Sequence, residues 1–190
     1  ARAPDYTNGR GEQMIDQDVL ERVLHRSLRD GGDFAEVFAE DRVASSAMLD
    51  DGRIEELTSG RERGAGIRVV TGESTGFAHT TDLSEAGLLE AAAVAAAAAR
   101  GGNGGVRTIA LERRAVTPAS IGIRPESITK SQKVELLRRA EAAARGAGGD
   151  IRQVMAGYGD GRRRFVVANS DGVYAEDDQT RTRLVVQAVA

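Results

Sequence analysis

The chain has 190 residues, of which 41% are hydrophobic and 4% aromatic, enough for one large or two small domains with an aliphatic core. Its net charge of −3 argues against a dedicated nucleic-acid binder, for which a basic domain is expected. The sequence contains no cysteine, which excludes disulfides, thiolate catalysis and Cys-based zinc sites. We therefore expect a cytoplasmic protein without a membrane span.

The N-terminal region divides into a polar leader and a helix. Residues 1–15 are mostly polar, so we expect them to be a disordered leader. From Asp16 onward apolar residues recur at helical spacing, and Gly31 with Gly32 provides a stop signal. The spacing predicts a helix that begins near Asp16 and ends before these glycines.

The next stretch has the pattern of antiparallel strands. Residues 33–40 alternate between apolar and polar with period two, and residues 43–49 continue as a partner strand. Asp51-Gly52 is a strong hairpin signal that leads into a strand over residues 53–58. Together with the hairpin that follows, this pattern predicts a meander of about five strands.

A glycine-rich stretch over residues 59–81 forms that second hairpin. Its apolar pieces, residues 67–70 and 77–78, flank a polar segment centred on Gly72, which predicts two short strands and a tight turn. Gly72 and Gly76 mark places where the backbone either needs a positive φ or lets another segment come close.

The glycines of this stretch do not match a nucleotide-binding loop. A Walker loop needs Gly-Lys followed by Ser or Thr, and the only lysines, Lys130 and Lys133, lie far from it. A dinucleotide fingerprint starting at Gly64 and Gly66 has Val69 in its third glycine position, inside a predicted strand. We therefore interpret this stretch as a hairpin that packs against other elements.

An alanine-rich helix follows the hairpin. Asp82-Leu-Ser-Glu85 resembles a capping box, and residues 85–100 have the composition of a helix that lies close on a sheet. The run of glycine and asparagine at 101–105 ends it and forms a linker. We therefore place an N-terminal α+β unit over 16–102 and a linker or crossover segment over 103–130.

The C-terminal part has the pattern of a second unit over residues 131–190. Ser131 is expected to cap an amphipathic helix that ends at the glycines of 146–149. Strand-like runs then follow at 151–158, 164–169, 173–175 and 180–189. Gly159-Asp160-Gly161 and Ser170-Asp171-Gly172 are the expected turns between them.

The two halves share one order of elements: a helix, Gly-Gly-Asp, two strands, Asp-Gly and two more strands. This internal repeat predicts an α+β fold of two related units, each a curved antiparallel sheet with a helix packed on one face. The second unit lacks a counterpart of the alanine-rich helix. We therefore expect it to be truncated, with Ala190 not a natural end of the protein.

The titratable residues do not form a recognisable site. His25 has no second ligand at i+4, and His79 with Asp82 cannot close a zinc site that needs three or four ligands. The acidic residues that cluster in the first unit are Asp50, Asp51, Glu55, Glu56 and Glu62. Turn chemistry and solvent-facing alternation account for them better than catalysis. We predict no catalytic, metal-binding or cofactor-binding residue in this chain.

One basic run, Arg162-Arg163-Arg164, follows an expected turn at the start of a strand. In an acidic chain we interpret it as a set of solvated arginines that protect a sheet edge rather than a nucleic-acid patch.

The run from Gly64 to Ala78, GAGIRVVTGESTGFA, resembles the TldD/PmbA family, whose pattern is close to G-x-G-(I/V)-R-x-(I/V)-x-G-x-x-T-G-(F/Y)-A. The segment from Met48 to Ile54, MLDDGRI, resembles the strand-DG-strand hairpin of that family, and the TldD branch fits better than the PmbA branch. This resemblance covers most of the chain from about Asp16 onward.

The resemblance implies the N-terminal portion of a zinc-dependent peptidase that cleaves unfolded peptides. In the family, zinc is held in a C-terminal domain by an H-E-x-x-x-H helix and a downstream cysteine, none of which this chain contains. The implied role of this portion is scaffolding: a wall of the substrate chamber and part of a homodimer or of a heterodimer with a related family member.

Two alternatives from other classes remain open. One is a self-contained protein-interaction module with no catalytic partner domain. The other is a regulator of a nucleic-acid enzyme, since the family is also known as a modulator of DNA gyrase. The acidic composition gives a nucleic-acid partner little physical support.

Overall fold

A computed structural model describes residues 13–99, 108–117 and 119–190. The expected linker at 101–105 and most of the expected leader lie outside these residues. The elements, in chain order, are α1 (Gln17–Leu28), β1 (Phe34–Asp50), β2 (Arg53–Thr71), β3 (Ser74–Thr80), α2 (Glu85–Ala98), β4 (Glu112–Arg113), the 3-10 turn η1 (Pro125–Ser127), α3 (Lys130–Gly146), β5 (Gln153–Asn169) and β6 (Val173–Val189). This mixed composition confirms the predicted α+β class.

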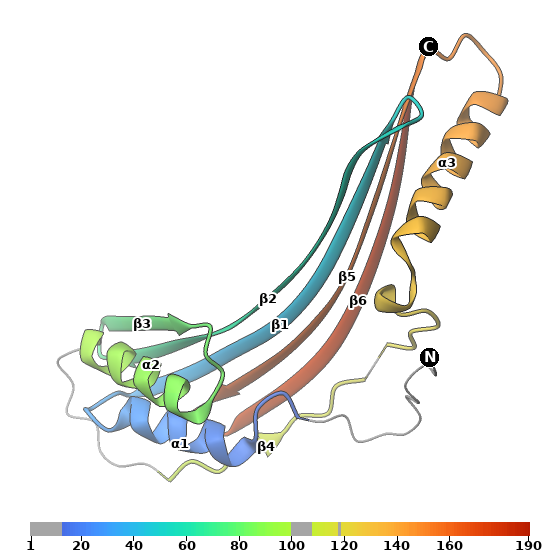
Figure 1. The fold of residues 1–190 in the computed structure, drawn as a ribbon. Coiled ribbons are helices and arrows are strands. Elements are labelled where there is room, and N and C mark those ends of the chain that lie inside the picture. The colour runs from blue at the N-terminus through green and yellow to red at the C-terminus, as the bar shows by residue number, and fades with distance from the viewer. Residues whose placement is uncertain (1–12, 100–107, 118) are drawn as a thin grey trace.

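The strands form one curved sheet in the order β3-β2-β1-β5-β6-β4 (Figure 1). Its strand pairs are antiparallel except for the short parallel pair of β4 with β6. The hairpins β1–β2 and β5–β6 lie edge to edge because β1 pairs with β5 from Glu36↔Asn169 to Asp50↔Met155. The two predicted units therefore share a single continuous sheet.

The long strands differ from the sequence-based expectation. We expected a break after residue 40 and a turn at Gly159-Asp160-Gly161, but β1 and β5 run through both places. Asp160 and Gly161 are paired with Ser45 and Ala44, so the ladder continues across the small residues. The prediction of five short strands in the first unit was wrong because polar and glycine residues inside a strand resemble a turn in sequence.

Three of the predicted hairpin turns are confirmed, those at Asp51-Gly52, Gly72 and Gly172. Asp51 and Gly52 have φ of 47° and 81°, the two positive values that a type I′ turn requires. Gly72 and Gly172, with φ of 56° and 90°, occupy the β2–β3 and β5–β6 turns. Gly76 has no positive φ; instead, α2 lies directly against it.

All three helices lie on the same face of the sheet. In Figure 1, α1 and α2 cover one end of the bent sheet, and α3 lies along the other end on the same outer side. The register agrees, since Val37 of β1 is buried in the cluster that includes α1 and α2, and Leu49, of the same parity, is buried in the cluster with Leu137 of α3. No described helix is long and apolar enough to cross a membrane.

Two segments outside the helices and the long strands also contribute to the core: the residues just before α1 and the crossover segment. Ile15, in the stretch expected to be disordered, is buried in the α1–α2 cluster. Ile109 and Leu111 of the crossover segment are buried in the same cluster, and β4 then pairs with the start of β6. The crossover therefore returns across the covered end of the sheet before α3 begins.

Candidate functional site: the polar face of the sheet

The face of the sheet opposite the helices is called here the polar face. Because side chains alternate along a strand, Arg42, Ala44 and Ser46 of β1 lie on it, while Ser45 and Ala47 lie on the helix-covered face. In Figure 1 no described helix lies on this inner side of the bend. The polar face is therefore the large uncovered surface of the described part of the chain.

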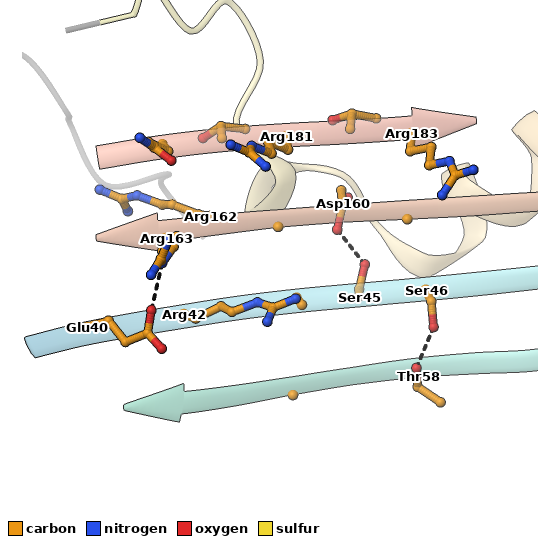
Figure 2. A pocket seen from close by; sticks show the side chains of 17 residues that line it. Glu40, Arg42, Ser45, Ser46, Thr58, Asp160, Arg162, Arg163, Arg181 and Arg183 are labelled. Carbon is orange, nitrogen blue, oxygen red and sulfur yellow. Dashed lines mark hydrogen bonds and ion pairs between the residues drawn. The ribbon is translucent and has the colours of Figure 1, made fainter. Parts of the chain in front are cut away.

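The floor of this face is made of small residues. Across β2, β1 and β5, Gly60, Ala44 and Gly161 are register partners, and the next row contains Thr58, Ser46 and Gly159. These rows form the base of an open hollow of about 1160 Å³ (Figure 2).

The space above the glycines of the floor is open except at Gly161, where an added Cβ atom would lie 3.1 Å from the Val43 carbonyl oxygen. A Cβ atom added at Gly60, Gly157 or Gly159 would have no atom within 4 Å. Packing therefore does not require glycine at these positions. Glycine in a strand interior is also typical of places where another backbone approaches closely.

Aromatic and charged side chains bound the hollow toward α1 and α2. The Arg163 guanidinium lies 5.5 Å from the ring centroid of Phe38 and 5.1 Å from that of Phe165, in cation–π geometry. Its Nε donates to a carboxylate oxygen of Glu40 at 2.6 Å (Figure 2). This end of the polar face is therefore held by an ion pair and two rings.

The basic run predicted to protect an edge lies instead on β5, a central strand. Arg162 pairs with Asp178 at 2.6 Å, and Arg164 pairs with Glu176 at 3.2 Å, both across the β5–β6 pair. The edge interpretation was wrong because it depended on a turn at residues 159–161 that does not exist. These arginines tie β5 to β6.

On the helix-covered side of the same strands, a buried polar cluster joins α3 to both hairpins. Lys133 Nζ lies 2.6 Å from Asp160 Oδ2 and donates to Ser45 Oγ, also at 2.6 Å. Ser45 Oγ donates to Asp160 Oδ1 at 2.6 Å, and the Tyr158 hydroxyl donates to Oδ2 at 2.8 Å. The Lys133 and Asp160 side chains are only 7% and 2% exposed.

The electrostatics of this cluster keep it charged. Burial raises the pKa of Asp160, but hydrogen bonds from Lys133, Ser45 and Tyr158 outweigh that effect and hold the pKa below its usual value. Burial, with the adjacent Asp160 carboxylate, raises the pKa of Tyr158 to about 12. Lys133 is an ion-pair partner and not a free base, so we interpret the cluster as the anchor of α3.

The sequence did not reveal this cluster, although one signal was present. Lys133 lies four residues before Leu137, which is fully buried against β1 and β5, so the two share one face of α3. A lysine on the apolar face of a helix requires a buried acid. Asp160 was hidden because its two flanking glycines suggested a turn.

The residues singled out as possible ligands lie apart. His25 is exposed in the last turn of α1. His79 is exposed on the edge strand β3 and stacks on Phe77 with a centroid distance of 6.5 Å, while the Asp82 carboxylate accepts from the Ser84 amide. Among the described residues, no three His, Asp or Glu side chains are grouped to hold a metal ion. These residues do not fit a zinc site.

Most of the clustered acids lie at or near the β1–β2 turn. Asp51 pairs with Arg145 of α3, and Asp50 accepts from Gln153 at 2.8 Å. Glu56 accepts from Ser46 and Thr58. Glu55 and Glu62 are exposed on β2. The turn explanation for Asp51 is confirmed by its positive φ.

Comparison with known proteins settles the relationship. Residues 35–99 match the model of PmbA/TldA metallopeptidase domain 1, and residues 123–190 match that of the PmbA/TldA metallopeptidase central domain. The chain belongs to the PmbA/TldD family. It is 28% identical over 174 residues to a metalloprotease TldD homolog of Haemophilus influenzae, covering 90% of this chain and 35% of that protein. A metalloprotease of Methanothermobacter thermautotrophicus is 30% identical over 181 residues, covering 93% and 38%.

Two solved structures show that similar chains have the same fold. A putative modulator of DNA gyrase from Bacteroides thetaiotaomicron superimposes with a TM-score of 0.70 at 18% identity, covering 90% of this chain and 40% of that one. TldE from Thermococcus kodakarensis gives a TM-score of 0.60 at 16% identity, with 90% and 40% covered. The chain therefore spans about a third of the length of its curated relatives and two fifths of these solved chains.

Proposed function

We propose that this chain forms the scaffold of a cytoplasmic TldD-like zinc-dependent peptidase, and that its polar face is a wall of the chamber that receives unfolded peptides. The observation that carries the proposal is the asymmetry of the sheet. Its outer face is covered by α1, α2 and α3, whereas its inner face is uncovered and floored by glycine, alanine and serine.

The chemistry of that floor suits an extended peptide. A sheet face that only needs solvation is usually covered by long polar side chains, which occupy the space above the strands. Here Gly60 and Gly159 leave that space open, so a peptide backbone can approach the sheet closely. Contacts with a backbone do not depend on peptide sequence, as a protease for unfolded chains requires.

The zinc and the partner belong to other parts of the assembly. We propose that zinc is held by an H-E-x-x-x-H domain elsewhere in the full-length protein, where it activates water and polarises the scissile carbonyl. The role of this chain is to bind and orient peptide, and to contribute to a dimer with an identical or related family member. Metalloprotease relatives that extend well beyond the matched region support this division.

Site-specific cross-linking of the full-length protein tests the proposal. A photo-cross-linkable residue replaces Gln179 on the polar face, with a matched replacement of Arg139 on the exposed side of α3 as the control. A biotin-labelled unstructured peptide should cross-link from position 179 and not from position 139. Cross-linking from position 139 alone, or from neither position while the peptide is hydrolysed, would contradict the proposal.

A regulatory role is the second candidate, because a similar solved structure is described as a putative modulator of DNA gyrase. The net charge of −3 does not favour direct contact with DNA. A titration of the full-length protein with duplex DNA at several salt concentrations separates the two roles. Salt-dependent DNA binding without peptide cross-linking would favour the regulator.

A further inference from the structure

Three arginines of the polar face have no carboxylate partner among the described residues. Arg42 lies on β1, and Arg181 and Arg183 lie on β6; all three line the hollow and are exposed (Figure 2). Glu62 is the register partner of Arg42 on β2 but makes no ion pair with it. These three residues are called here the open arginines.

The other charged residues that line the hollow are paired. Arg163 is paired with Glu40, and Arg162 with Asp178. Asp160 is paired with Lys133 from the helix-covered side. The open arginines therefore leave a local positive charge in a chain whose net charge is −3.

The register places the open arginines around the glycine floor. Arg181 is paired with Gly161 and Arg183 with Gly159, so the floor lies directly beside both arginines. Arg42 is two strands away and in the neighbouring row, that of Gln179, so its Cα lies about 12 Å from that of Arg181 for a strand spacing of about 4.8 Å and a rise of about 3.4 Å per residue. Arg181 and Arg183 are i and i+2 on one strand, about 7 Å apart along it. Alternate side chains of an extended peptide have the same spacing.

We propose that the open arginines select peptides with acidic segments, binding side-chain carboxylates while the peptide backbone lies over the glycine floor. This inference rests on the proposed function and specifies the substrate class. The guanidinium group suits it because its donors match a carboxylate in two-point geometry. An acidic peptide is otherwise repelled by an acidic protein, so a local basic surface is needed to attract it.

The same surface is less suited to nucleic acid. Binding of single strands combines arginines with exposed aromatic rings on which bases stack. The aromatic rings beside the hollow, those of Phe38 and Phe165, are both covered by the Arg163 guanidinium, which is fixed by Glu40. The chemistry of the hollow therefore favours carboxylates of an extended peptide.

Binding measurements on the full-length protein test the inference. Two fluorescent unstructured peptides are used, one rich in Asp and Glu and the other with Asn and Gln at the same positions. The test variant carries Arg42→Gln, Arg181→Gln and Arg183→Gln. The control variant carries Arg138→Gln, Arg139→Gln and Arg152→Gln, which remove the same charge from exposed residues outside the hollow.

The wild-type protein should bind the acidic peptide more tightly than its amide counterpart, and added salt should remove the difference. The test variant should lose about tenfold in affinity for the acidic peptide only, since three exposed ion pairs are removed. The control variant should match the wild type. Equal melting temperatures show that the variants are folded.

Three results would overturn the inference. Equal affinity of the wild-type protein for the two peptides would show that binding does not depend on the carboxylates of the peptide. An equal loss in the test and control variants would reduce the effect to net charge. Tighter binding of a single-stranded oligonucleotide through the same arginines would assign the surface to nucleic acid. Cross-linking from position 179 without a charge preference would leave the proposed function standing and refute only this inference.

Discussion

At the scale of single residues, two glycines of the β2–β3 hairpin have different requirements. An added Cβ at Gly76 would lie 2.0 Å from the Ala95 carbonyl oxygen and 2.6 Å from the Ala99 nitrogen. Gly76→Ala therefore forces α2 away from β3, and we expect a loss of at least about 2 kcal/mol in the free energy of unfolding. Gly72→Ala places alanine at a φ of 56° in an exposed turn and should cost roughly 1 kcal/mol.

Gly60→Ala is the matched control for these two variants, because no atom lies within 4 Å of the added methyl group. Its effect should stay within about 0.5 kcal/mol. Urea denaturation of the three variants measures all of these values. A Gly76 variant as stable as the Gly60 variant would show that α2 does not rest on β3 at this position.

Lys133 gives a second prediction at this scale. Lys133→Met leaves the buried Asp160 carboxylate without its cation, and we expect a loss of about 3–5 kcal/mol at pH 7. The exposed Lys130 is the natural control, and Lys130→Met should change stability by less than about 0.5 kcal/mol.

The pH dependence identifies the cause of that loss. In the wild type the pKa of Asp160 is lowered, so its stabilising contribution is present above the unfolded-state pKa of about 3.9 and is lost as pH falls through the folded-state value. In Lys133→Met the hydrogen bond and the charge that lower this pKa are lost while burial still raises it, so the pKa should rise relative to the wild type and protonation becomes more favourable. The stability difference between wild type and variant should therefore shrink from pH 7 to pH 4. A constant difference would mean that lost packing, and not charge, is responsible.

At the scale of elements, the structure shows which residue caps the N-terminus of α3. Thr129, and not the expected Ser131, is the N-cap: its hydroxyl accepts from the Gln132 amide, and the Gln132 side chain accepts from the Thr129 amide. Thr129→Ala should cost about 1 kcal/mol. Ser131→Ala, inside the first turn, should cost less than about 0.5 kcal/mol. Thermal melting of both variants decides between the two caps, and a larger loss at Ser131 would contradict this assignment.

Local signals were sufficient to place the three helices and the turns that contain a glycine with positive φ, but not the N-cap of α3 or the course of β5 through residues 159–161. Asp51-Gly52 and Asp171-Gly172 were predicted correctly because a positive φ is a property of a few residue types. The length of β1 and β5 was not predicted, because their central residues lose the apolar alternation that marks a strand. What continues these strands is the ladder between Ser45 and Asp160, which involves residues 115 positions apart.

The candidate site was missed for the same reason. The hollow combines rows from four strands, and no single row has an unusual sequence. Arg181 and Gly60 are separated by most of the chain, yet both belong to the row that contains Ala44 and Gly161. Only pairing between the two hairpins, which the internal repeat did not predict, brings these residues together.

At the scale of the whole molecule, that pairing makes the two units share their cores. The cluster under α1 and α2 contains Val37 of β1 and Val166 of β5. The cluster under α3 contains Leu49 of β1 and Ala156 of β5. Each cluster therefore uses the same two central strands, and neither can lose its strands without exposing the other.

We therefore predict that the chain unfolds in one cooperative transition. Leu88→Ala, in the α1–α2 cluster, and Leu137→Ala, in the α3 cluster, each remove a fully buried side chain and should cost about 2–5 kcal/mol. Because the strands are shared, each variant should lower a single common melting temperature, with equal calorimetric and van't Hoff enthalpies. Two resolved transitions, each shifted by only one of the variants, would show instead that the hairpins fold as independent domains that merely meet at the β1–β5 edge.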